Sequence, residues 1–319
     1  MRYVILLFMV LALNGSELGD LYRKSGVGAV AAKLENELAS YEYWKNYLSK
    51  VDTSFGFYDK DKDLLIVGKG RREMLLWRYR GGTLSFDSRY SVRLGKNSGA
   101  KMREGDRKTP IGAYRLVKKL EKVDQFYGPL ALVTEYPNLL DRLEGRNGGG
   151  IWVHGFPLNS NKRDEDTRGC VALDNNLLLK LKSRIDLPKS RIIIFEEEIR
   201  KVPKEDIVLI MSMIYQWRKA WADNDLQSYL SFYADEFRRY DGMKKEAFSA
   251  YKKRIFDKGE EKEIIFHDFE VAPNPTLLRE RVYKVNFEEE YRAPSHSFSG
   301  TKELYIKVAD GKATIIAEQ

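Results

Sequence analysis

Cysteine occurs only once in this chain of 319 residues, at position 170, so no intramolecular disulfide can hold the fold together. A chain without such cross-links must fold around buried apolar side chains. Hydrophobic residues make up 43% and aromatic residues 12% of the sequence, which is typical of folded domains rather than of disorder. Because about 300 residues exceed the size of one ordinary core, we expect two domains.

The first 16 residues have the features of a cleavable secretory signal. Arg2 precedes a short apolar run, and the small residues Gly15 and Ser16 follow it. The run has about half of the roughly 20 residues that a membrane-spanning helix needs, and an uncleaved anchor is the alternative. No later segment is apolar enough to span a bilayer. We therefore predict a signal peptide at 1–16 and export of the mature protein to the periplasm.

The charge pattern argues against a nucleic-acid partner. The net charge is +8, but basic residues are interleaved with acidic ones, as in Arg71-Arg72-Glu73, and form no basic stripe. Outside the cytoplasm, a basic surface would attract the anionic cell wall or lipid head groups. A lysine-rich, solvated surface without a partner is the alternative.

Three sequence patterns follow one another along the mature chain. In an N-terminal helical segment, 17–55, apolar residues recur at helical spacing over 28–50 and predict an amphipathic helix. This helix would pack on its own domain or pair with a second copy of the chain. Residues 56–201 contain short β-prone runs separated by glycines, which predict a mainly β domain. The third region, 202–319, has a proline at its second position, Pro203, and passes from helical spacing to four β-type segments, as in an α+β unit.

The β domain contains a histidine and a cysteine that could react together. His154 ends a β-type run, and a polar loop after Gly155 can bring Cys170 back beside it. An imidazole can take the proton of a thiol and leave a thiolate that attacks an amide carbonyl. Gly169 allows close backbone approach, so the amides of Gly169 and Cys170 could bind the oxyanion that forms. A small, buried and inert cysteine is the alternative.

Three motifs together resemble the L,D-transpeptidase catalytic domain, also called the YkuD domain, over roughly residues 60–200. They are Gly105-Asp106 with Thr109-Pro110-Ile111-Gly112, then Trp152-Val153-His154-Gly155, then Thr167-Arg168-Gly169-Cys170-Val171. The resemblance implies a β-rich fold, without a cofactor, that cleaves the peptidoglycan stem peptide between its third-position diamino acid and a terminal D-alanine.

The same resemblance assigns roles to single residues. It implies that Cys170 is the nucleophile, that His154 is the base, and that the Gly169 and Cys170 amides are the oxyanion donors. A backbone carbonyl would orient the histidine. The substrate would contact four neighbours of this pair, which are Trp152, Gly155, Thr167 and Arg168.

Two positions depart from the family pattern. The family commonly has serine where this chain has Thr167, which keeps the hydroxyl, and arginine where it has Ala172. Alanine removes a cation that would help hold a carboxylate, unless Arg163 or Arg168 substitutes for it. The whole-chain arrangement also resembles the L,D-carboxypeptidases that set cell shape in helical bacteria. We therefore predict a cysteine-dependent hydrolase that trims tetrapeptide stems to tripeptides; a cross-linking L,D-transpeptidase is the alternative.

The C-terminal region carries a second resemblance. Trp217, Trp221 and Tyr229 are spaced as in the opening of nuclear-transport-factor-2-like domains, in which helices pack against a curved sheet. Such domains often enclose a pocket, so a wall glycan or another sugar is a candidate ligand, whereas a plain core role for these aromatics is the alternative. A non-catalytic wall-binding protein is therefore a third hypothesis. His267 and His296 lack partners at metal-ligand spacing, so we expect no zinc site.

Overall fold

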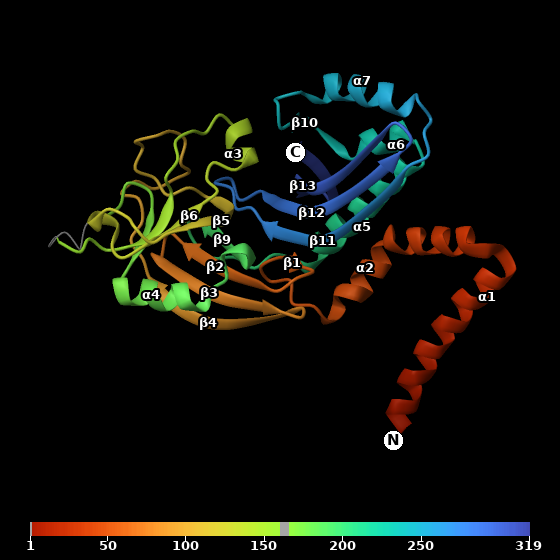
Figure 1. Ribbon diagram of the computed structural model, residues 1–319, viewed down its shortest axis with the longest axis horizontal. Helices are drawn as coiled ribbons and strands as arrows, with labels where there is room; N and C mark the ends of the chain where they lie inside the picture. The colour runs from red at the N-terminus through yellow and green to blue at the C-terminus, as the bar shows by residue number, and fades with distance from the viewer. Residues whose placement is uncertain (1, 160–165) are drawn as a thin grey trace.

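The computed structural model describes residues 2–159 and 166–319. Two sheet-based domains lie side by side, and a helical segment at the N-terminus reaches away from them (Figure 1). The middle domain holds an eight-stranded sheet in the order β4-β3-β2-β9-β5-β6-β7-β8, and the C-terminal domain a six-stranded sheet in the order β1-β11-β12-β13-β14-β10. A mainly β domain followed by an α+β domain, as the sequence predicts, is confirmed.

The middle domain begins with a run of antiparallel strands joined by tight turns. Gly81 and Gly82 connect β3 to β4 with φ angles of 52° and 79°, the left-handed conformation that a two-residue hairpin requires. The central strand β2 is buried along its whole length, between β3 and β9. The elements of this domain are β2 (Lys62–Gly68), β3 (Glu73–Arg80), β4 (Thr83–Ser91), β5 (Gly112–Leu120), β6 (Ala131–Thr134), α3 (Leu139–Leu143), β7 (Trp152–Gly155), β8 (Val171–Leu173), α4 (Asn175–Arg184) and β9 (Ser190–Phe195), with single 3₁₀ turns at Gln125–Tyr127 and Leu187–Lys189.

In the C-terminal domain, helices pack against one sheet around an aromatic core. Trp217 is fully buried, and its ring stacks on those of Tyr229 and Phe266, both with centroids 5.7 Å away. The aromatic residues that the sequence places at helical spacing are thus core residues. The elements are α5 (Lys204–Ala222), α6 (Leu226–Ser231), β10 (Tyr233–Arg239), α7 (Lys245–Phe256), β11 (Glu263–Pro273), β12 (Arg281–Ala293), β13 (His296–Ala309) and β14 (Lys312–Glu318).

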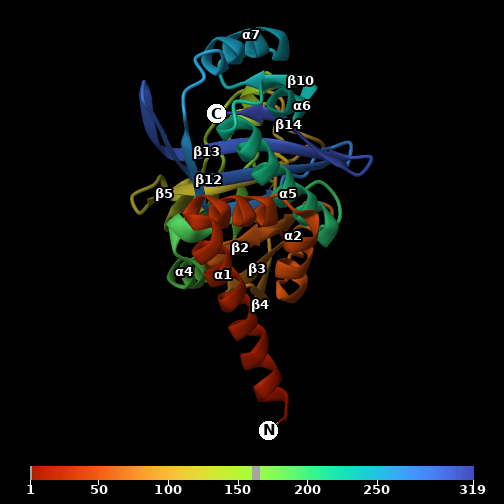
Figure 2. The same ribbon diagram turned by 90° about the vertical axis from the view of Figure 1, so that its right-hand side faces the viewer.

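The sequence predicts one helix over 28–50, but the N-terminal segment is interrupted at Gly26, where φ is 76° and ψ is −178°, and again at Ser40. α1 (Arg2–Leu38) ends before Ser40, whose extended backbone (ψ 134°) interrupts the helix and whose hydroxyl accepts a hydrogen bond from the Tyr43 amide. α2 (Tyr41–Tyr47) and a 3₁₀ turn at Leu48–Lys50 follow. Figure 2 shows the first part of α1 projecting beyond both domains. No helix among the described residues is both long and apolar enough to cross a membrane.

The helices α1 and α2 pack on the C-terminal domain rather than on the domain that follows them in sequence. Trp44 of α2 is buried and stacks on Tyr215 of α5 with ring centroids 5.5 Å apart. The sequence places residue 57 in the middle domain, but β1 (Phe57–Tyr58) pairs antiparallel with β11, and Phe57 is opposite Val271. The chain therefore adds a strand to the C-terminal sheet before it builds the middle domain.

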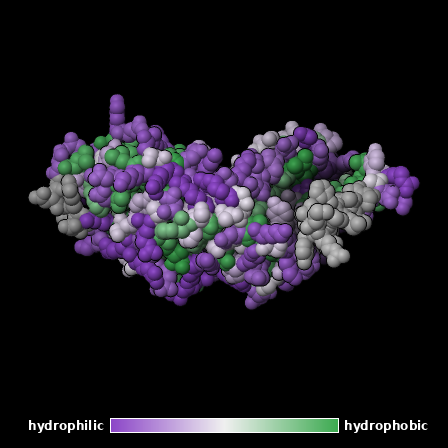
Figure 3. Space-filling view, turned by 90° about the horizontal axis from the view of Figure 1, so that it is seen from below, coloured by the Kyte–Doolittle hydropathy of each residue, from purple (hydrophilic) through white to green (hydrophobic). Residues whose placement is uncertain are grey.

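Buried polar contacts also connect the two domains. The Ala113 amide donates to Asn274 Oδ1 at 2.9 Å, and Glu270 of β11 accepts from both Lys62 and Arg191 of the middle domain. The outer surface is different, since on the face shown in Figure 3 hydrophobic residues form scattered patches among hydrophilic ones. The interface between the domains is thus part of the fold.

Candidate active site

A pocket of about 410 Å³ at the ends of β7 and β8 contains both Cys170 and His154. Gly169 is buried beside it, within the turn that carries the cysteine. Six residues that the sequence predicts for the site line this pocket, namely Trp152, His154, Gly155, Thr167, Arg168 and Cys170. Arg163, the other arginine considered in place of Ala172, lies outside the described residues.

The position of His154 makes one ring nitrogen a base. β7 is hydrogen-bonded on one side to β6 and on the other to β8, so the histidine projects from an inner strand. Its Nδ1 lies 2.7 Å from the Gly155 carbonyl oxygen, which can only accept, so Nδ1 carries the hydrogen and Nε2 has the free lone pair. Burial lowers the pKa of His154, although the Gly155 carbonyl raises it in part, so the ring is neutral at neutral pH.

The cysteine is also neutral before reaction. Cys170 Sγ donates to the Gly150 carbonyl at 3.3 Å. Burial raises the pKa of Cys170, and the Trp152 amide and the charge of Lys101 offset this only in part. A thiol and a neutral imidazole therefore face one pocket, and a proton has to move when a substrate arrives.

The turn before the cysteine is held by Thr167. The Thr167 hydroxyl donates to the Cys170 carbonyl at 2.7 Å and accepts from the Gly169 amide at 3.0 Å. The Gly169 amide, expected to be an oxyanion donor, is thus bound within the turn, and of the two expected donors the Cys170 amide is left. Gly169 has φ +135°, and a Cβ there would lie 2.7 Å from the Lys108 carbonyl, so the turn requires glycine.

Position 155 requires glycine because there is no room for a side chain, and not because of its backbone conformation. A Cβ on this residue would lie 2.1 Å from Asn175 Oδ1 and 2.8 Å from Pro129 Cδ. The close packing of Asn175 against Gly155 keeps the carbonyl that orients His154 in place. Arg168, in contrast, is exposed at the rim of the pocket.

The comparisons with known proteins agree with this geometry. The L,D-transpeptidase catalytic domain (YkuD) family matches residues 62–194, and the Cds6 C-terminal NTF2-like domain family matches 209–319. The crystal structure of the helical cell shape determining protein Pgp2 from Campylobacter jejuni is 37% identical, with TM-score 0.83 over 88% of this chain and 99% of that one. This chain belongs to the Pgp2 family.

Two further structures support the same assignment. The K307A mutant of Campylobacter jejuni Pgp2 is 36% identical, with TM-score 0.85 over 89% of this chain and 99% of that one. Bd1075 of Bdellovibrio bacteriovorus is 26% identical, with TM-score 0.64 over 81% of this chain and 91% of that one. A comparison with curated protein sequences found no match. The middle domain of this Pgp2 family member is thus an L,D-transpeptidase catalytic domain, and the C-terminal domain is NTF2-like.

Several residues that line the pocket were not predicted as site residues from the sequence, among them Tyr127, Arg93 and Lys101. Tyr127 closes one side, with its ring edge-on to His154 at 5.1 Å and tilted against Trp152 at 4.8 Å. Arg93 and Lys101 bring positive charge. The sequence points to Lys101 only indirectly, because its ion-pair partner is Asp106 of the motif at 105–112, with Nζ and Oδ1 2.8 Å apart.

Asp106 itself has a structural role. Burial raises its pKa, but the bond from Lys101 and those from the backbone amides of Met102, Arg103 and Lys108 outweigh this and lower the pKa of Asp106 to about 2. This carboxylate therefore stays charged and holds Lys101 and the loop that borders the pocket.

Metal chemistry has no obvious location among the residues described. No group of three or more histidine, cysteine, aspartate or glutamate side chains in 2–159 and 166–319 could hold a metal ion. His267 lies on β11, where its Nδ1 is 3.0 Å from Asp268 Oδ2, outside the pocket around Cys170.

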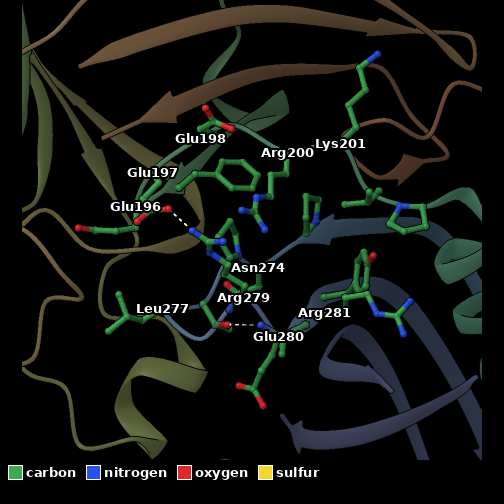
Figure 4. Close-up of a pocket in the computed structure, with 18 residues that line it drawn as sticks. Glu196, Glu197, Glu198, Arg200, Lys201, Asn274, Leu277, Arg279, Glu280 and Arg281 are labelled. Atoms are coloured by element: carbon green, nitrogen blue, oxygen red, sulfur yellow. Dashed lines mark hydrogen bonds and ion pairs between the residues drawn. The ribbon is translucent and has the colours of Figure 1, made fainter. Parts of the chain in front are cut away.

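A second cavity, of about 220 Å³, lies where the end of the middle domain meets the connection between β11 and β12 (Figure 4). Charged and apolar side chains both line it, and two of the charged residues, Arg279 and Glu197, form an ion pair. It contains neither the cysteine nor the histidine of the site, so we place the chemistry in the pocket at β7 and β8.

Proposed function

We propose that this protein is a peptidoglycan L,D-carboxypeptidase that uses Cys170 to remove the terminal D-alanine from tetrapeptide stems. The observation that best supports this proposal is that a thiol and an imidazole, whose Nδ1–H is bound to the Gly155 carbonyl, line one pocket of a YkuD domain. The product would be a tripeptide stem, and the role would be cell-wall remodelling and control of cell shape.

The geometry supports a two-step reaction. His154 Nε2 takes the thiol proton while Sγ attacks the carbonyl carbon of the third residue, and the Cys170 amide binds the oxyanion. The C–N bond then breaks, and the imidazolium gives its proton to the departing amine of D-alanine. In the second step, His154 takes a proton from water, whose oxygen attacks the thioester. The thiolate leaves and recovers the proton, and the tripeptide acid is released.

Water is the acceptor that we favour over an amine. The residue two positions after the nucleophile is Ala172, which offers no charge to hold the carboxylates of a second stem. An L,D-transpeptidase that joins two third-position residues shares the first step and is the alternative. The periplasm, reached through a signal at 1–16, is the location that fits a peptidoglycan substrate.

Two binding hypotheses remain separate from this activity. The aromatics that suggest a sugar ligand in the C-terminal domain, Trp217 and Tyr229, are fully buried in its core, which counts against that role for them. Homodimer formation through the N-terminal helices is supported only by exposed apolar side chains on α1, where Tyr22 is 61% and Val27 72% exposed.

The test is incubation of the purified protein with defined tetrapeptide muropeptides, followed by mass analysis of the products. Tripeptide and free D-alanine from the native protein, but not from Cys170→Ala or His154→Ala, are the expected result. Cysteine-dependent dimers joined through two third-position residues would identify a transpeptidase instead. No cysteine-dependent product would leave wall binding without catalysis as the better explanation.

A further inference from the structure

The segment between β4 and β5 brings a buried lysine to the active-site pocket. Lys101 is 4% exposed and lines the same pocket as Cys170. Its Nζ donates to Asp106 Oδ1 at 2.8 Å and to the Arg103 carbonyl at 3.1 Å. Burying an ammonium group is costly unless the group is paired and hydrogen-bonded, and Lys101 has both kinds of partner. Its charge is therefore held in one place, where it acts through space without leaving these partners.

The Lys101 segment is attached to the part of the chain that accepts the thiol hydrogen bond. The Asn147 amide donates to the Met102 carbonyl at 3.2 Å, and the Glu104 amide donates to Asn147 Oδ1 at 3.0 Å. Three residues after Asn147, the Gly150 carbonyl accepts from Cys170 Sγ. A short stretch of backbone thus connects this segment to the thiol on one side.

The same segment also supports the turn that carries the thiol. The Lys108 carbonyl packs so closely on Gly169 that a Cβ there would lie 2.7 Å from it. The Lys108 amide donates at 3.1 Å to Asp106, the carboxylate that holds Lys101. The segment therefore approaches Cys170 from two sides, and this fixes where the charge of Lys101 lies relative to Sγ.

Lys101 acts differently on the two groups that exchange a proton. Burial raises the pKa of Cys170, and the Trp152 amide and the charge of Lys101 lower it in part. At His154, burial lowers the pKa and the Gly155 carbonyl raises it in part. The charge of Lys101 therefore bears on the thiol more than on the imidazole. Proton transfer creates a thiolate beside an imidazolium, and a cation on the thiolate side favours that state.

The other ionisable residues of the pocket are placed differently. Three of them are exposed at its rim, namely Glu104, Asp166 and Arg168. Arg93 is half-buried and stacks on Phe156, with 4.3 Å between the guanidinium carbon and the ring centroid. The Tyr127 ring packs edge-on against the imidazole. Among the pocket residues that the structure describes, Lys101 is therefore the buried cation.

We infer that Lys101 is a positioning residue, whose fixed ammonium group stabilises the Cys170 thiolate as His154 takes the thiol proton. This inference rests on the proposed function, because it explains how a buried thiol gives up its proton in the first step. Lys101 keeps its own protons. The transferred proton passes from Sγ to Nε2, and the electron pair of the S–H bond stays on sulfur. Asp106 holds the ammonium group in place.

The experiment follows the reactivity of the thiol without a peptidoglycan substrate. Cys170 is the single cysteine of the chain, so the rate of alkylation by iodoacetamide reports on this thiol alone. Measured across pH, the rate gives a midpoint, where half of the thiol is ionised, and a plateau for the full thiolate. Lys101→Met removes the charge and keeps the length of the side chain. We expect it to move the midpoint to higher pH, to slow alkylation at neutral pH about tenfold, and to leave the plateau unchanged.

Two further variants separate charge from shape. Lys101→Met combined with Asp106→Asn leaves no uncompensated carboxylate in the segment, and its midpoint should remain above that of the native protein. Lys101→Arg retains the charge, and its midpoint should lie close to the native one. If Lys101 only shaped the segment, the plateau would fall and the midpoint would stay in place. That result, or a native midpoint in either variant that carries Lys101→Met, would overturn the inference.

Lys96→Met is the matched control, because Lys96 belongs to the same segment, is exposed and does not line the pocket. It should change neither the midpoint nor the plateau, and a shift as large as that of Lys101→Met would reject a specific role for Lys101. D-Alanine release by the native protein is measured separately. Its absence alongside a Lys101-dependent midpoint would reject the carboxypeptidase and retain the effect of Lys101 on the thiol. Release with a midpoint independent of Lys101 would reject the inference alone.

Discussion

Two regions of the molecule bury ionisable side chains: the pocket around Cys170 and His154, and the centre of the C-terminal domain around Glu318. In the pocket, burial raises the pKa of the thiol and lowers that of the imidazole. Around Glu318, burial also raises the carboxyl pKa, but the charges of Lys302 and Lys252 outweigh it and the pKa falls below its ordinary value. Glu318 accepts hydrogen bonds from Lys302 at 2.8 Å and from the Tyr233 hydroxyl at 2.7 Å.

The difference separates neutral groups that can exchange a proton from charged groups that hold the fold. A buried acid or base without a counter-charge is neutral, and its proton can be transferred when a substrate changes the local charge. A buried carboxylate that is paired and hydrogen-bonded stays ionised, and removing one partner leaves an uncompensated charge. The pocket is arranged in the first way and the C-terminal core in the second.

The largest effect on stability should come from breaking the C-terminal cluster. Glu318→Ala removes the acceptor shared by Lys302 and Tyr233 and should lower the free energy of unfolding by about 3–5 kcal/mol. Urea unfolding followed by tryptophan fluorescence would report it, since Trp217 and Trp221 lie in the same core. Asp257→Ala breaks the exposed pair with Lys253 on α7 and should cost no more than about 0.5 kcal/mol. Equal losses in the two variants would contradict the comparison.

Apart from substitutions of Cys170 or His154 themselves, the largest loss of activity should come from Gly169→Ala. The added Cβ meets the Lys108 carbonyl at 2.7 Å, so the turn and Cys170 must shift. A displacement of this kind should lower kcat/KM for D-alanine release by about 10²-fold. Gly28→Ala is the control, because no atom lies within 4 Å of a Cβ there and Gly28 does not line the active-site pocket. Full activity of the Gly169 variant would show that the turn is not rigid.

A smaller effect should follow from Thr167→Val, which keeps the shape of the side chain and removes both of its hydrogen bonds. The Gly169 amide and the Cys170 carbonyl would lose their partner, at a cost of about 1–3 kcal/mol in unfolding free energy. Thr167→Ser should restore most of the stability and activity, because it retains the hydroxyl. Thermal unfolding and kcat/KM of both variants would test this, and a serine variant as impaired as valine would refute the hydroxyl's role.

The smallest effect should be a shift in the pH dependence of activity and stability. It differs between the pocket around His154 and the C-terminal core around Glu318. Because burial lowers the pKa of His154 from its ordinary 6.5, the base form persists and the acid limb of kcat/KM should lie below pH 6.5. The same shift makes stability fall as pH drops through 6.5, since the unfolded imidazole binds the proton more readily. Glu318, with its pKa lowered from 4.5, contributes stability that is complete above pH 4.5 and lost only at more acid pH. If kcat/KM already fell on acidification above pH 6.5, that result would contradict a neutral His154 beside a neutral Cys170.

Local sequence information was sufficient to place Cys170 and His154 in one pocket, but not to identify the residues around them. The motifs at 152–155 and 167–171 predict Cys170 and His154 in one site because short strands and glycine turns encode their own geometry. Arg93 could not be found in this way, because it reaches the site only through pairing with Ala172, a contact between distant parts of the chain. The bond from the Gly169 amide to Thr167 depends on a side-chain rotamer, which no spacing rule predicts.

The two-residue strand β1 has a consequence for how this architecture can be inherited. Phe57 and Trp44 belong to the apolar core of the C-terminal domain, although both precede the catalytic domain in sequence. A gene fragment that ended near residue 202 would encode the catalytic domain with an orphaned apolar segment at its front. Recombination at that boundary would yield a protein with exposed apolar surface that tends to aggregate. We therefore expect the N-terminal segment, the catalytic domain and the C-terminal domain to be inherited together.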